Sequence, residues 1–184
     1  MRRLETRLDG PLLIEPTVHR DERGFFLEAY RRSAMAELGV DAESVQENHS
    51  RSTRGVVRGM HYQAGMDKLV RCARGAILDV VVDIRRGSPT FGYWEAFELN
   101  DENMRQLLAP AGFGHGFCVV SEVADVLYMC SAYYDPELEG AFAYDDPEIG
   151  IAWPAGLELS PSARDAAAPL LSEISDRLPF SYRS

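Results

Sequence analysis

The sequence predicts an all-β protein of the sandwich or barrel type, and within that class a jelly roll. Short runs rich in β-branched and aromatic residues recur along the chain. Turns that contain Gly and Pro separate these runs, and the sharpest is Pro110-Ala111-Gly112-Phe113-Gly114. No internal repeat or linker divides the 184 residues. We therefore expect a single domain over residues 1–184, with only a few short peripheral helices.

Composition and charge exclude several classes of protein. Hydrophobic residues make up 46% of the chain, too many for a disordered protein. The net charge of −10 opposes general binding to nucleic acid, which needs a positive surface. No apolar stretch reaches the roughly 18 residues of a membrane span, and no signal peptide begins the chain, so we expect a cytoplasmic protein without membrane contact. The three cysteines lie in apolar runs without a Cys-x-x-Cys motif, which indicates reduced, buried thiols.

The first half of the chain contains several β-forming runs and one helix. The runs cover residues 11–18, 24–30, 45–50, 56–63, 68–73 and 76–84. Prolines punctuate the first run, which is typical of an edge strand. The last two runs flank Arg74-Gly75 and are expected to form a hairpin. The helix is expected over residues 31–38, because Gly39 stands in the usual C-terminal position.

The second half continues this pattern. Its expected strands cover residues 93–99, 106–109, 115–120 and 123–131, and a short helix is expected over residues 170–177. The chemistry, however, is concentrated in the first half, over residues 45–63. Within the run 56–63, alternation predicts one face with Val57, Gly59, His61 and Gln63, and an opposite face with Arg58, Met60 and Tyr62.

Residues 45–63 hold two histidines, three arginines, two glutamines and an asparagine on expected strands. Such a set of polar side chains on strands indicates a face that looks into a polar cavity. A lone histidine on a strand is more often a core residue, but Arg58, Gln63 and Lys68 lie close to His61 in sequence. We therefore interpret His61 as the reactive centre, since a neutral imidazole with a pKa of about 6.5 accepts a proton at cellular pH.

His115 ends the pattern Pro110-x-Gly112-x-x-His115, whose spacing resembles the second motif of the cupin superfamily. Metal-binding cupins carry His-x-His and then Glu in their first motif, whereas this chain has His61-Tyr62-Gln63 followed by Asp67. Two imidazoles and an amide are a poor ligand set for a first-row metal. A cupin without a metal site is therefore the preferred interpretation, and a metal-dependent cupin oxygenase or isomerase is the alternative.

Other polar residues allow both a functional and an ordinary structural interpretation. Arg23, Arg58 and Lys68 lie on different strands, and they suit either a phosphate-binding pocket or a solvated surface. Tyr128 lies in an apolar strand, where it either packs in the core or donates a proton as an acid with a pKa of about 10. Asp165, taken by itself, reads as a surface charge.

Ordered motifs along nearly the whole chain carry a more specific signal. They include Asp21-Glu22-Arg23-Gly24-Phe25-Phe26, Gln46-x-Asn48-x-Ser50-x-Ser52, Arg58-Gly59-Met60-His61-Tyr62-Gln63, Gly87-Ser88-Pro89-Thr90-Phe91-Gly92, Gly112-Phe113-Gly114-His115-Gly116-Phe117 and Ile151-Ala152-Trp153-Pro154. With these motifs the chain resembles the dTDP-4-dehydrorhamnose 3,5-epimerases, which are cupin-fold enzymes of deoxysugar biosynthesis. The resemblance implies epimerisation of a dTDP-linked 4-keto-6-deoxyhexose, without a metal or a nicotinamide cofactor.

The resemblance also implies roles for individual residues. A base removes a proton beside the C4 carbonyl, an enolate forms, and an acid returns a proton from the opposite face. His61 matches the base, Tyr128 the acid, and Asp165 the carboxylate that orients the histidine. Lys68 matches the cation beside the keto oxygen. The residues that match the diphosphate and nucleoside contacts of the family are Arg23, Gln46, Asn48 and Arg58, and the further substrate contacts implied are Glu28, His115, Glu139 and Arg164.

The family pattern further implies a homodimer, in which Arg23 and Glu28 reach the site of the partner subunit. This chain departs from the common pattern in a short loop over residues 64–67, and in Met129 and Arg164, where lysine is common. These differences leave open whether C3, C5 or both are epimerised, or whether the enzyme is a keto-isomerase. A non-catalytic cupin that binds a sugar nucleotide is the alternative from another functional class.

Overall fold

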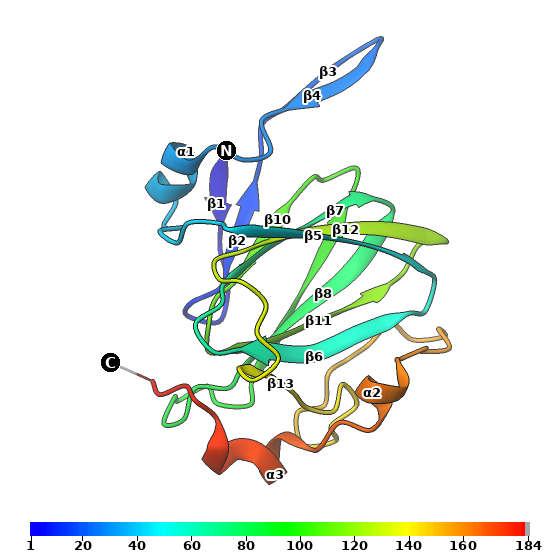
Figure 1. The fold of residues 1–184 in the computed structure, drawn as a ribbon. Helices are drawn as coiled ribbons and strands as arrows, with labels where there is room; N and C mark the ends of the chain where they lie inside the picture. The colour runs from blue at the N-terminus through cyan, green and yellow to red at the C-terminus, as the bar shows by residue number, and fades with distance from the viewer. Residues whose placement is uncertain (183–184) are drawn as a thin grey trace.

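The computed structural model describes residues 1–182, whose centre is formed by two antiparallel β-sheets packed face to face (Figure 1). The six-stranded sheet contains, in spatial order, β1 (Arg2–Leu4), β2 (Leu12–Glu15), β10 (Gln106–Ala109), β7 (Lys68–Arg74), β12 (Val123–Cys130) and β5 (Gln46–Thr53). The five-stranded sheet contains β13 (Glu139–Ala141), β6 (Val57–Gln63), β11 (Phe113–Val119), β8 (Ala76–Asp83) and β9 (Trp94–Asn100). This arrangement confirms the predicted all-β jelly-roll class.

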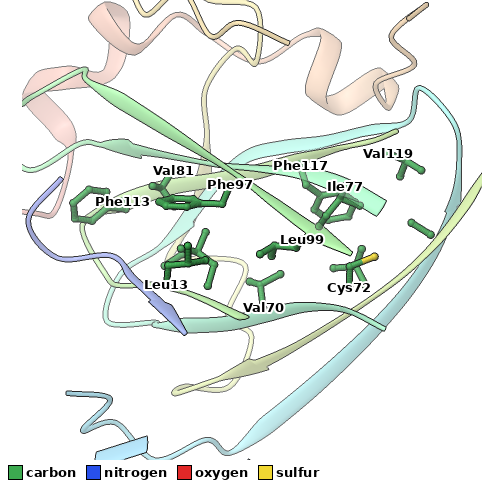
Figure 2. Packing of buried hydrophobic residues seen from close by; sticks show 14 of the residues in the cluster. Leu13, Val70, Cys72, Ile77, Val81, Phe97, Leu99, Phe113, Phe117 and Val119 are labelled. Atoms are coloured by element: carbon green, nitrogen blue, oxygen red, sulfur yellow. The ribbon is translucent and has the colours of Figure 1, made fainter. Parts of the chain in front are cut away.

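The main hydrophobic core fills the space between the two sheets (Figure 2). Leu13 and Val70 project into it from the six-stranded sheet, and Ile77, Phe97 and Phe117 project from the five-stranded sheet. Val70 and Ile77 are completely buried. Since β-branched and aromatic side chains fill such an interface well, the runs that predicted strands in the sequence are also the source of the core.

Short helices cover the outer faces of both sheets. On the six-stranded sheet, α1 (Arg32–Glu37) buries Met35 against Ile14. On the five-stranded sheet, Leu171 and Leu178 pack against Met60, which β6 turns away from the central core. These two leucines belong to the C-terminal segment that holds α2 (Ala163–Ala166), α3 (Leu171–Ile174) and the 3₁₀ helix η1 (Ser175–Arg177). No helix within residues 1–182 is long and apolar enough to cross a membrane.

A two-stranded arm projects away from the two sheets (Figure 1). It consists of β3 (Val18–Asp21) and β4 (Gly24–Leu27), which pair with each other and join neither large sheet. Phe25 and Phe26 near its tip are 53% and 72% exposed. Adjacent aromatic side chains at this level of exposure are typical of a surface that another molecule covers.

Two local predictions were wrong. The runs 68–73 and 76–84 do not form a hairpin, because β7 and β8 lie in different sheets. The chain crosses between the sheets at Gly75, which has a φ of +75° and where a Cβ would lie 2.1 Å from the carbonyl oxygen of Val123. The run 11–18 is not an edge strand either, since β2 pairs with β1 on one side and β10 on the other, and Pro11 and Pro16 flank it.

Candidate active site

A cavity of about 500 Å³ is lined by residues from both sheets and from the segment that enters α2. Most of the residues that the sequence singled out meet on its walls. These are Arg58, His61, Lys68, His115, Tyr128, Glu139, Arg164 and Asp165. The structure therefore brings together side chains that are scattered over more than a hundred positions of the sequence.

A smaller cavity of about 130 Å³ adjoins the main one, and Gln46 and Asn48 of β5 line it. The Gln46 amide donates a hydrogen bond to the Asn48 side-chain oxygen at 3.1 Å. Four residues belong to the walls of both cavities, namely His61, Lys68, Tyr128 and Glu139. The two cavities are therefore adjacent parts of one site, with the proposed base and acid where they meet.

Two of the expected substrate-binding residues do not line either cavity. Arg23 lies at the arm and pairs with Asp21. Glu28 follows the arm, and its carboxylate accepts a hydrogen bond from Nε of Arg31 at 2.9 Å. Within a single chain, therefore, the structure assembles the site without the segment that contains Arg23 and Glu28.

The side chains of β6 do not alternate between the two faces as predicted, because Arg58 and His61 line the same cavity. On the neighbouring β11, Phe117 pairs with Arg58 and His115 pairs with His61, so a β-bulge inserts one extra residue into β6. Gly59 lies in the bulge with a φ of +138°, and a Cβ there would lie 2.6 Å from the Cα of Gly116. The predicted placement of Arg58 opposite His61 was therefore wrong.

His61 and Asp165 form a hydrogen-bonded pair, with 2.7 Å between Nε2 and Oδ1. The His61 side chain is 25% exposed and the Asp165 side chain only 4%, so the imidazole is the more accessible member of the pair. With the Nε2 proton donated to Asp165, the neutral ring keeps a free lone pair on Nδ1. Asp165 lies in α2, which begins where the Ser162 hydroxyl accepts the Asp165 backbone N–H at 3.1 Å.

Burial lowers the pKa of His61 below its ordinary value of 6.5, and the nearby Lys68 ammonium lowers it further. The hydrogen bond and the charge of Asp165 oppose this change, and Glu139 opposes it more weakly. The net result is a lowered pKa. His61 is therefore neutral at pH 7, as a general base must be.

Lys68 is the only lysine in the chain; every other residue among the 19 lysines and arginines is arginine. Its side chain lines both cavities, and burial lowers its pKa from the usual 10.5. A chain that uses arginine at every other basic position keeps a compact ammonium here, which indicates that this position requires one.

Tyr128 reaches the site from β12, which pairs with β5 on one side and β7 on the other. Burial raises the pKa of its phenol above 10. The hydroxyl therefore stays protonated at pH 7, as a proton donor must. Because β12 belongs to the six-stranded sheet and β6 to the five-stranded sheet, Tyr128 and His61 enter the site from opposite sheets.

Comparison with known proteins agrees with this geometry. A family model described as dTDP-4-dehydrorhamnose 3,5-epimerase matches residues 5–173. The chain belongs to the dTDP-4-dehydrorhamnose 3,5-epimerase family. The dTDP-4-dehydrorhamnose 3,5-epimerase of Salmonella typhimurium is 48% identical over 174 residues, which cover 92% of this chain and 95% of that protein. The dTDP-4-dehydrorhamnose 3-epimerase of Streptomyces niveus is 44% identical over 173 residues, which cover 92% and 83%.

A solved structure extends the match to three dimensions. The dTDP-6-deoxy-D-glucose-3,5-epimerase of Legionella pneumophila, in complex with dTDP-4-keto-L-rhamnose, superposes with a TM-score of 0.95. It is 45% identical, and the alignment covers 100% of this chain and 99% of that one. The predicted family and the predicted cupin-like fold are therefore both confirmed.

This member of the epimerase family has a second histidine–carboxylate pair, which the sequence analysis missed. The Nε2 atom of His115 lies 2.8 Å from Oδ1 of Asp79, and the Asp79 side chain is completely buried. Burial raises the pKa of Asp79, and its Oδ2 atom has no hydrogen-bond partner among residues 1–182. The available signal was a carboxylate within the apolar run Ile77-Leu78-Asp79-Val80-Val81.

An ion pair joins two walls of the site in this epimerase-family chain. The Arg164 guanidinium lies 2.6 Å from the Glu139 carboxylate, which also accepts a hydrogen bond from the Tyr134 hydroxyl at 3.1 Å. The carboxylate raises the pKa of Arg164. Within residues 1–182, no three His, Cys, Asp or Glu side chains lie close enough together to share a metal ion.

Proposed function

We propose that this protein epimerises a dTDP-linked 4-keto-6-deoxyhexose at C3 and C5. The observation that supports this most strongly is the placement of a neutral histidine and a protonated tyrosine on opposite sheets around one cavity. Inversion at carbon requires removal of a proton from one face and delivery to the other. Base and acid on two facing walls meet this requirement.

The steps follow from the chemistry of these side chains. The C4 carbonyl acidifies the C–H bonds at C3 and C5, and Nδ1 of His61 takes one of these protons. The electron pair moves into an enolate whose negative oxygen is stabilised by the Lys68 ammonium. Tyr128 then donates its proton to the carbon from the opposite face. Asp165 holds the His61 ring and stabilises the imidazolium formed in the first step.

The larger cavity suits the diphosphate end of the substrate. Arg58, Arg164 and Lys68 provide local positive charge in a chain whose net charge is −10. Guanidinium groups bind phosphate oxygens in a bidentate manner. Gln46 and Asn48 line the adjoining smaller cavity, and their amides would make hydrogen bonds with the diphosphate and the nucleoside. We assign further contacts with the substrate to His115 and Glu139.

The direct test is deuterium incorporation. The protein is incubated with dTDP-4-keto-6-deoxyglucose in D₂O, and deuterium at C3 and C5 is located by NMR. We expect exchange at both carbons, together with inverted product. A complete lack of exchange, with the protein folded and dTDP bound, would refute the proposed activity and would favour a cupin that only binds sugar nucleotides.

A 3-epimerase is the second candidate. A relative of 44% identity carries that name, and a 3′-monoepimerase from Streptomyces bikiniensis shares the fold. The same experiment distinguishes the two candidates, since a 3-epimerase would give inverted product at C3 alone. We further propose a single domain over residues 1–184 and a cytoplasmic location. The three buried, unpaired cysteines fit a reducing compartment.

The rate should depend on pH in the direction set by His61. Because only the neutral imidazole accepts a proton, kcat/KM should rise with pH through a pKa below 6.5. Asp165→Asn removes the main cause that raises this pKa. The variant should therefore show its acid limb at lower pH and a plateau reduced by roughly 10²- to 10⁴-fold. A pH–rate profile of both proteins is the measurement, and an acid limb shifted to higher pH would contradict the assignment.

We also propose a homodimer in which each arm completes the site of the other subunit. Exposed Phe25 and Phe26, together with the absence of Arg23 and Glu28 from the cavity of one chain, support this arrangement. Mixed dimers test it. His61→Asn and Arg23→Ala should each be nearly inactive alone. Subunits exchanged between the two should regain roughly a quarter of the wild-type activity, because half of the dimers then contain one intact site of two.

A site formed within one chain would regain nothing on mixing. The control is a mixture of His61→Asn with Asp165→Asn. His61 and Asp165 belong to the same chain's part of the site, so both sites of every mixed dimer then carry one of the two changes and no activity should return. Recovery in the Arg23→Ala mixture together with none in this control would support an arm that serves the partner subunit, and no recovery in either mixture would refute it.

A further inference from the structure

The loop between β6 and β7 carries the chain from the five-stranded to the six-stranded sheet in only four residues, 64–67. Lys68 is the first residue of β7, directly after this loop. The first residue of a strand is where pairing frays most easily. Something other than the strand itself must therefore hold the start of β7 in place.

Asp67 makes the contacts that fix this point. Its backbone N–H donates to the Ser131 hydroxyl at 2.8 Å, and its carbonyl accepts the Ser131 backbone N–H at 3.0 Å. Its carboxylate Oδ1 accepts the Ala111 backbone N–H at 2.8 Å. Ser131 follows β12 and Ala111 follows β10, which are the two strands that flank β7. Asp67 thus ties the start of β7 to both of its neighbours.

Lys68 needs such a fixed backbone because its ammonium is held against its preference for water. Among residues 1–182, no hydrogen bond or ion pair reaches the Lys68 ammonium, and burial lowers its pKa. A lysine side chain has several rotatable bonds and gains solvation by turning outward. Titratable groups that face it from the surrounding elements are His61, Asp79, Tyr128, Cys130 and Glu139.

We infer that Asp67 is a positioning residue, which holds Lys68 in the cavity by fixing the first residue of β7 between β10 and β12. The structural part of this inference stands on the hydrogen bonds alone. Its consequence for turnover rests on the proposed function, in which Lys68 lies beside the keto oxygen. The carboxylate acts as a hydrogen-bond acceptor in this role, and its charge is not required.

The single lysine makes the inference directly measurable. Protein labelled with ¹³C at lysine Cε gives one resonance, whose pH titration reports the pKa of Lys68 without substrate. In the wild type this pKa should lie below 10.5. In Asp67→Ala it should rise toward 10.5, because the ammonium moves into water. Where kinetics are measured, kcat should fall by roughly 10- to 100-fold with KM changed less than about twofold.

Two control variants distinguish the effect of Asp67 on the position of Lys68 from the effect of its charge and from the general loss of a carboxylate hydrogen bond at β7. Asp67→Asn keeps an oxygen that accepts the Ala111 N–H and removes only the charge, so it should titrate as the wild type does and restore kcat. Asp101→Ala removes a carboxylate that accepts the Gly75 N–H at 2.8 Å, at the far end of β7. This control should leave the lysine titration unchanged.

An unchanged lysine titration in Asp67→Ala would overturn the inference, and so would an Asp67→Asn variant that behaves like Asp67→Ala. If Asp67→Ala does not fold, Ser131→Ala tests the same contacts, since it removes the hydroxyl that accepts the Asp67 N–H. The same upward change of the lysine pKa is expected there, and its absence would again overturn the inference. If the wild type lacks epimerase activity, the proposed function fails while the lysine titration still decides the role of Asp67.

Discussion

Replacement of His61 by asparagine should abolish deuterium exchange at both C3 and C5, with a loss of at least roughly 10³-fold in rate. The reason is that no other free base lines the cavity among residues 1–182: His115 is hydrogen-bonded to Asp79, Glu139 is paired with Arg164, and Asp165 is the buried partner of His61. The measurement is NMR of the substrate in D₂O. Binding of dTDP, measured by calorimetry, should be unchanged.

A control is needed because His61→Asn leaves the buried Asp165 carboxylate without its partner. An unpaired buried charge costs about 3–5 kcal/mol in the free energy of unfolding, so lost activity could reflect lost folding. The double variant with Asp165→Asn replaces that charge by a neutral amide. It should recover thermal stability and remain without exchange, and any recovery of exchange would contradict the role of His61 as base.

Replacement of Tyr128 by phenylalanine should separate the two halves of the reaction. The phenylalanine ring keeps the packing and loses only the acidic hydroxyl, so the fold should be little affected. His61 still removes a proton and returns it, or solvent deuterium, to the same face. We therefore expect continued exchange together with inverted product reduced by roughly 10²- to 10⁴-fold.

The measurement compares two quantities in one sample, the deuterium content of recovered substrate and the amount of inverted product. A variant that loses both equally would show that Tyr128 is required for the first proton transfer as well. A variant with wild-type product formation would show that another acid returns the proton. Only a selective loss of product agrees with the proposed division between base and acid.

Much of the fold could be predicted because strand formation leaves a local signal. Period-two hydrophobic runs separated by Gly and Pro turns predicted most strands of both sheets. The same signal failed at Arg74-Gly75, because the sequence of a tight turn is the same whether the next strand joins the same sheet or the other sheet. Which sheet a strand joins is decided by packing between distant segments, and no local pattern records it.

The site was predictable to a different extent for each residue. Local context favoured His61, but no local feature connects it with Asp165, which lies 104 positions further along the chain. Only the family motifs linked the two. The side of β6 on which Arg58 lies was predicted wrongly, because a bulge depends on how two strands pair and not on the sequence of one strand. Asp79 was missed because a buried carboxylate in an apolar run resembles an ordinary interruption of a strand.

The entry of base and acid from opposite sheets has a consequence for the core. Sheets that pack face to face lie about 10 Å apart, and the side chains between them set this spacing. Phe117 belongs both to that core and to the wall of the cavity. The distance between His61 and Tyr128 is therefore governed by the hydrophobic packing between the sheets, and the thickness of the sandwich determines how closely a sugar ring is held between its two proton-transfer groups.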